Sequence, residues 1–182
     1  MNGQFWWYAA RSSGLVAWML LAASVVWGLA ISGKVRPPRV RPAWMLDLHR
    51  FLGGLATIFT GVHITSIVAD SYVHFGVADI LVPFASSWRP AAVAWGVVGM
   101  WLLGAVELTS LARRHLPRRV WRRIHMLSLP LYGVASMHFL QAGTDAAGAI
   151  VFGLVAGVSG IVVVLTGVRM LARPRRAAAA IA

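Results

Sequence analysis

The feature that most constrains this chain is a series of long apolar runs with almost no charge. A helix needs about 20 mostly apolar residues to cross the roughly 30 Å hydrocarbon core of a bilayer. A further apolar stretch, at residues 76–88, is too short to cross and indicates an interfacial or re-entrant piece. The expected fold class is therefore all-α, a polytopic membrane helix bundle with five transmembrane helices. The five spans are expected at about residues 12–33, 46–69, 90–112, 120–141 and 146–170.

The basic residues indicate how these helices are oriented. Fifteen of the 17 Lys and Arg side chains fall in or beside the first-to-second loop, the third-to-fourth loop and the segment after the fifth span. Because cytoplasmic loops carry the excess of basic residues, we expect an outside N-terminus and a cytoplasmic C-terminus. The formal net charge of +12 then reflects topology, so we expect membrane lipid but no nucleic acid as a partner. The expected location is a cell membrane, such as a bacterial inner or plasma membrane.

Composition excludes several other classes of protein. With 59% hydrophobic and 12% charged residues, the chain is too apolar for a disordered protein or an ordinary soluble domain. The absence of cysteine excludes disulfides, thiolate zinc sites, cysteine-ligated iron–sulfur clusters and cysteine nucleophiles. We expect one membrane domain at residues 1–172 and a mobile cytoplasmic tail at 173–182, without a flavin or nicotinamide domain.

Four of the six histidines fall at matching depths on two of the expected spans. His49 and His63 are 14 residues apart on the second span, and His125 and His138 are 13 residues apart on the fourth. Both spans run from inside to outside, so each offers one imidazole at two levels about 20 Å apart. Imidazoles from facing helices can fill both axial positions of a haem iron. The pattern therefore predicts metal ligation by these four histidines in two haems stacked across the bilayer.

Other residues of these two spans support a haem site. Arginines suit haem propionates, and we expect them to lie at the cytoplasmic level: Arg50, Arg122 and Arg123. Glycines are expected to make room for the flat rings: Gly53, Gly54, Gly61 and Gly133. A spacing of 14 returns to within ~40° of the same helix face, whereas a spacing of 13 misses it by ~140°. Pro130 lies between His125 and His138, so we expect it to kink that helix.

Two stretches of the chain resemble a known family. These are LDLHRFLGGLATIFTGVHI at residues 46–64 and WRRIHMLSLPLYGVASMHFL at residues 121–140. Over roughly residues 12–170 the chain resembles the ferric reductase-like transmembrane domain of ferric reductases, NADPH oxidases and the haem-binding subunit of periplasmic methionine sulfoxide reductase. The resemblance implies that His49 and His125 ligate an inner b-type haem, and that His63 and His138 ligate an outer one. Met126 departs from the pattern, since a basic residue often stands at that position.

The resemblance also implies a function. Family members carry electrons from cytosolic NADPH through flavin and haems to an outer acceptor. The large members have six spans and C-terminal flavin and nicotinamide modules, so this short form is more similar to the methionine sulfoxide reductase subunit. We therefore expect transmembrane electron transfer through two haem b groups, as an oxidoreductase component with separate redox partner proteins as donor and acceptor. A partner would supply a flavin or a quinone.

Two alternatives remain open from the sequence. In the first, the protein is a quinol-linked b-type cytochrome in which Glu107 handles protons, although an ion pair between Glu107 and a nearby arginine is the simpler expectation. In the second, it is a haem-free membrane scaffold whose histidines form helix–helix hydrogen bonds. None of the residues is expected to act as a catalytic acid, base or nucleophile. Asp47 is expected to cap the second helix or interact with its dipole.

Overall fold

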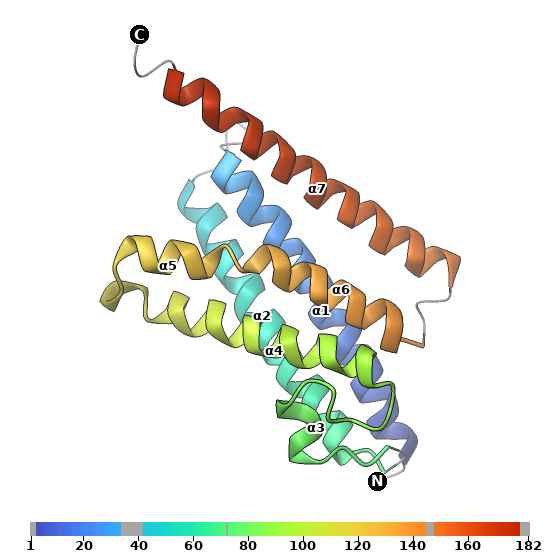
Figure 1. Ribbon diagram of the computed structural model, residues 1–182. Helices are drawn as coiled ribbons and strands as arrows, with labels where there is room; N and C mark the ends of the chain where they lie inside the picture. Colours follow the sequence, from blue (N-terminus) through green and yellow to red (C-terminus); the bar gives the residue numbers. More distant parts are fainter. Residues whose placement is uncertain (1–2, 34–41, 72, 145–147, 179–182) are drawn as a thin grey trace.

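The structure is a computed structural model that describes residues 3–33, 42–71, 73–144 and 148–178. Over these ranges the chain is helical, with connecting turns and loops and no strand (Figure 1). The α-helices are α1 (Gly3–Gly33), α2 (Pro42–Ala69), α3 (Val77–Leu81), α4 (Pro90–Leu111), α5 (Arg118–His125), α6 (Ser128–Ala142) and α7 (Ala149–Ala178), and a short 3₁₀ helix, η1, covers Arg113–His115. The all-helical class predicted from the sequence is confirmed.

Four helices in the described part of the chain are long and apolar enough to cross a membrane. They are the segments Gln4–Gly33, Ala43–Ala69, Pro90–Leu111 and Ala149–Leu171, which lie in α1, α2, α4 and α7. These helices indicate a membrane protein, as the apolar runs predict. The remaining expected span, at residues 120–141, is divided between α5 and α6, and neither piece is counted among the four.

The division between α5 and α6 has a local cause. α5 ends at His125 and α6 begins at Ser128, and the two helices follow one another end to end (Figure 1). Pro130 has no N–H group with which to bond the carbonyl of Met126, so an unbroken helix would lose a bond and clash there. In the interrupted chain Pro130 lies in the first turn of α6, where proline is tolerated. The kink expected from Pro130 thus lies about one turn earlier, at Met126 and Leu127, whose backbone angles stay in the right-handed helical region.

The helices associate as two antiparallel pairs. α1 packs along α2, α4 packs along α6, and contact between α2 and α4 is sparse. The buried core lies where α1 meets α6 and α7, around Trp18, Val25, Tyr132 and Val155. The two pairs therefore join where α1 meets α6, while α2 faces α4, α5 and α6 across the middle of the molecule.

The two ends of the bundle differ in character. One end, called here the arginine-rich end, carries the exposed arginines Arg50, Arg113, Arg114, Arg118, Arg119, Arg122 and Arg123. The other, called here the loop end, carries the segment between α2 and α4. Within that segment α3 is a short helix held against α4, because the indole N–H of Trp101 donates to the carbonyl of Leu81 at 3.0 Å. Arg89 donates to the carbonyl of Gln141 at 2.8 Å and so ties the start of α4 to α6.

Several helix limits differ from the expected spans. α1 begins at Gly3 rather than near residue 12, and α2 begins at Pro42, a residue suited to the first helical position. α7 continues to Ala178, through six residues of the expected tail and past Pro174. The first residues of the expected fifth span (146–147), the last of the tail (179–182) and the basic residues within 34–41 lie outside the described part.

Candidate functional site

The four histidines singled out by the sequence form two facing pairs. At the loop end the ring centroids of His63 and His138 are 6.2 Å apart, with ring planes at 75°. At the arginine-rich end the centroids of His49 and His125 are 5.9 Å apart, with planes at 81°. Matched depth on two helices predicts this pairing, and the structure brings the same residues together.

The interruption between α5 and α6 explains how the second helix pair can supply both rings. On one straight helix, residues 13 apart would point about 140° away from each other. His125 is the last residue of α5 and His138 lies in α6, so the break at residues 126–127 separates their helical frames. Each histidine therefore faces its partner on α2.

At the loop end, backbone carbonyls hold both rings. Nδ1 of His63 lies 2.7 Å from the carbonyl oxygen of Ala10, and Nδ1 of His138 lies 2.8 Å from that of Ala92. A carbonyl only accepts hydrogen bonds, so each Nδ1 must carry the proton. The lone pair of each ring is then on Nε2, and a donated Nδ1–H is the usual support of a metal-bound histidine.

At the arginine-rich end, serines take part in holding the rings. Nδ1 of His49 lies 3.0 Å from the carbonyl oxygen of Ser24 and 3.2 Å from its hydroxyl oxygen. Nδ1 of His125 lies 3.3 Å from the hydroxyl oxygen of Ser110. The indole of Trp121 also stacks on the ring of His125, with centroids 5.0 Å apart and planes at 23°. Both rings of this pair are therefore held on the Nδ1 side, as at the loop end.

Three glycines stand directly behind three of the histidine rings. A Cβ at Gly14 would lie 2.8 Å from Nδ1 of His63, and one at Gly96 would lie 2.8 Å from Nδ1 of His138. A Cβ at Gly28 would lie 3.0 Å from Cε1 of His49. Such separations are well inside van der Waals contact, so any larger residue at these positions would push the ring. The close approach of helix to ring therefore requires glycine.

Small residues follow the same spacing on α1 and on α4, the helices that pack against the histidine-bearing ones. Gly14 and Gly28 of α1 are 14 residues apart, and so are Gly96 and Ser110 of α4. Each helix thus presents two small residues at the two histidine levels of its partner helix. Sequence reasoning missed them, although their spacing equals that of His49 and His63 and could have revealed them.

Of the glycines predicted to make room for flat rings, Gly61 and Gly133 face away from the histidine pairs. A Cβ at Gly54, Gly61 or Gly133 would meet nothing within 4 Å, and Gly61 and Gly133 are exposed. At about 100° per residue, Gly61 and Gly133 lie on the opposite sides of their helices from the nearby histidines. Gly53 faces Glu107 of α4 instead.

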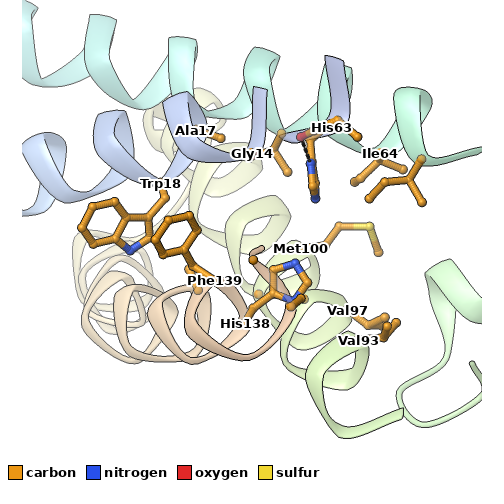
Figure 2. Close-up of a pocket in the computed structure, with 18 of the residues that line it drawn as sticks. Gly14, Ala17, Trp18, His63, Ile64, Val93, Val97, Met100, His138 and Phe139 are labelled. Atoms are coloured by element: carbon orange, nitrogen blue, oxygen red, sulfur yellow. Dashed lines mark hydrogen bonds between the residues drawn. The ribbon is translucent and has the colours of Figure 1, made fainter. Parts of the chain in front are cut away.

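A cavity of about 410 Å³ surrounds the loop-end pair. Figure 2 shows His63 and His138 on opposite walls, with Trp18 and Phe139 stacked at one side. The lining is mainly apolar, with Met100 among the labelled side chains, and the volume is in the range of small-molecule and cofactor sites. A hollow with two imidazoles facing across it can hold a flat apolar group between them.

Charged side chains lie at both ends of the bundle. Arg50 of α2 and Arg122 and Arg123 of α5, predicted as propionate partners, are exposed at the arginine-rich end. Arg50 pairs with Asp47 at 3.5 Å. α2 begins at Pro42, five residues before Asp47, so the expected N-terminal cap is wrong. At the loop end, Arg11 lines the cavity and lies over the ring of Trp7. Sequence reasoning assigned no propionate partner to that end.

The donor set fits a metal bound by two imidazoles. An imidazole nitrogen binds a first-row metal at about 2 Å, and two such bonds in line would put the ring centroids about 6 Å apart. Both histidine pairs have this separation. Within the described ranges no group of three or more His, Cys, Asp or Glu side chains is placed to hold a metal ion. A haem iron needs only two protein ligands because the porphyrin supplies the others.

Comparison with protein-family models, with curated proteins and with solved structures finds no match for the chain.

Proposed function

We propose that this protein is a membrane electron-transfer subunit that binds two b-type haems, one between each histidine pair. The observation that carries the proposal is the geometry of these pairs. Two rings face each other at both ends of the bundle with centroids 5.9 and 6.2 Å apart, and the Nδ1 sides are already bonded. Hydrogen bonding between helices would not by itself explain why the hydrogen bonds that the described residues make to all four imidazoles are at Nδ1.

In this proposal the chain provides binding, orientation and insulation. His49 and His125 hold one group, and His63 and His138 hold the other. The bound iron supplies reversible one-electron chemistry, which the protein does not otherwise contain. Apolar side chains of α1, α2, α4 and α6 make up most of the lining of the loop-end cavity. In this proposal Arg11 at that end and Arg50, Arg122 and Arg123 at the other would compensate propionate charge.

The proposal includes a direction across the membrane. The positive-inside rule places the arginine-rich end in the cytoplasm and the loop end outside, with α5 and α6 together forming the fifth span. The His49–His125 site would then accept electrons from a cytoplasmic-side donor, and the His63–His138 site would pass them to an outer-side acceptor. Redox partner proteins supply both reactions, and the donor's flavin or quinone belongs to the partner. The resemblance to the ferric reductase-like transmembrane domain supports this function.

Haem content and its dependence on each histidine test the proposal. The purified full chain should show a Soret band, reduced b-type bands and two haems per polypeptide. Replacing His63 or His138 with alanine should remove about half of the haem, and replacing His49 or His125 should remove the other half. Both members of a pair should affect the same spectral component, since each supplies one axial ligand to one iron.

The same experiment separates the proposal from a haem-free scaffold. His74→Ala and His115→Ala, which change histidines outside the two pairs, are the controls and should keep both haems. A folded, colourless wild-type protein would contradict the proposal and favour the scaffold. Unchanged haem content in all four paired-histidine variants would contradict the ligand assignment.

A further inference from the structure

Glu107 is the only acidic residue of α4, and it lies within a membrane-crossing helix. Ionisable side chains in such helices are costly and usually have a function. An arginine partner is the simple expectation, yet no hydrogen bond or ion pair of Glu107 occurs with any residue that the structure describes. The placement of this carboxyl group therefore needs another explanation.

The carboxyl group of Glu107 reaches across to α2. A Cβ built on Gly53 would lie 2.8 Å from Oε1 of Glu107, so the carboxyl group occupies the place that a side chain at residue 53 would fill. The same Cβ position lies 3.8 Å from the hydroxyl oxygen of Ser24. That hydroxyl is the one beside Nδ1 of His49, and Gly53 lies one helical turn beyond His49 toward His63.

Glu107 thus lies close to the arginine-rich-end site, on its side toward the loop-end site. Ser110, which contacts His125, is three residues along α4, or about one turn. The carboxyl group is placed in the sparse interface between the two helix pairs, where α2 faces α4. An electron passing between the two histidine sites would pass near this group.

The elements around Glu107 carry other charged and titratable groups. From Ser12 to Gly33, α1 has no charged or titratable side chain. Three elements bring charged or titratable side chains to the arginine-rich end of α4. They are Asp47, His49 and Arg50 of α2, Arg113, Arg114 and His115 of η1, and Arg118, Arg119, Arg122, Arg123 and His125 of α5. At the loop end the corresponding groups are His63 of α2, His138 of α6 and Asp79 of α3. At the arginine-rich end the carboxyl groups are thus those of Glu107 and Asp47. Asp47 is exposed and paired with Arg50.

From this placement we propose that Glu107 is a proton-binding residue coupled to the redox state of the His49–His125 site. The inference rests on the function proposed above. When this site gains one electron, the Glu107 carboxylate takes up one proton from water at the arginine-rich end. When the site passes the electron on, Glu107 releases the proton. The coupling follows from charge, because an added electron makes a nearby carboxylate less favourable than the neutral acid in a medium of low dielectric.

Redox titration of the purified full chain at a series of pH values tests this coupling. One of the two midpoint potentials should fall by up to about 59 mV for each unit rise in pH. This slope is the limit for one proton taken up per electron. In Glu107→Gln this dependence should disappear and the potential should rise, since a negative charge is lost. In a His63→Ala/His138→Ala variant, which keeps only the arginine-rich-end site, the dependence should remain.

Two further variants serve as control and second test. Asp47→Asn makes the same chemical change at an exposed carboxyl group of the same end and should keep the pH dependence. Gly53→Ala keeps the carboxyl group of Glu107 but displaces it from α2, so the pH dependence of the midpoint potential should become weaker. This variant also tests the proposal if Glu107→Gln does not fold.

The outcomes distinguish this inference from the proposed function. Two haems with pH-independent potentials in the wild type, or an unchanged pH dependence in Glu107→Gln with both haems bound, would overturn the role of Glu107 alone. A wild-type protein without haem would overturn the proposed function and this inference with it.

Discussion

Three of the four paired histidine rings lie against the backbone of a neighbouring helix. Gly14, Gly28 and Gly96 allow this, since a Cβ at any of them would lie closer to an imidazole than van der Waals contact permits. The histidines themselves were predictable because intramembrane imidazoles are rare and their spacing was informative. The glycines behind them were not, because the chain has 18 glycines and only the packing distinguishes their roles.

Substitution of these glycines should therefore affect one site at a time. Gly14→Ala and Gly96→Ala should displace His63 and His138 and remove the loop-end haem, while the arginine-rich-end haem is retained. We expect each to cost about 1–3 kcal/mol of stability, as for other overpacked positions. Haem content, reduced spectra and the thermal midpoint measure these effects.

Matched controls exist on the same helices as the histidines. Gly61→Ala and Gly133→Ala add a methyl group in open space, so both haems and the thermal midpoint should be unchanged. If these controls lost haem as readily as Gly14→Ala, the steric explanation would be wrong.

Among the helices, the divided span formed by α5 and α6 differs most from the prediction. Length and apolarity predicted one span over residues 120–141, and the structure has α5 and α6 in its place. Pro130 was identified from the sequence as the disturbing residue. The position of the break was not predicted from the sequence. A proline removes one backbone hydrogen bond, but packing decides at which residues the helix bends.

Replacing Pro130 should test whether this proline causes the division between α5 and α6. In Pro130→Ala the helix can continue through residues 126–129, which would rotate His125 relative to His138 by up to about 140°. One haem should then be lost or bound with altered axial ligation, visible by electron paramagnetic resonance. Pro90→Ala, at the first position of α4, is the control and should keep both haems. Normal ligation in Pro130→Ala would show that packing alone maintains the interruption.

For the whole molecule, the arrangement of two antiparallel pairs decides what can be bound. α1 with α2 and α4 with α6 each provide one wall, and the sparse contact between α2 and α4 leaves room for flat groups between the walls. The positive-inside rule predicts an orientation for this bundle, with the arginine-rich end expected on the cytoplasmic side.

The absence of cysteine allows a direct test of the orientation and of the fifth span. Single variants His115→Cys in η1 and Thr144→Cys after α6 place thiols at exposed positions on either side of α5 and α6. A membrane-impermeant maleimide added outside intact cells should label Thr144→Cys and Ser87→Cys but not His115→Cys. Labelling of His115→Cys and Thr144→Cys from the same side would show that α5 and α6 do not cross the membrane together.

The sequence by itself determined the helical class, the membrane setting and the four histidines at two depths. These properties follow from local quantities, namely the length and polarity of each run and the position of rare ionisable groups within it. Only the tertiary structure decided the rest: the glycines behind the rings, the break that turns His125 and His138 toward α2, and the placement of Glu107 against Gly53. Each of these depends on how closely two helices approach, and that distance is set by packing between segments far apart in the chain.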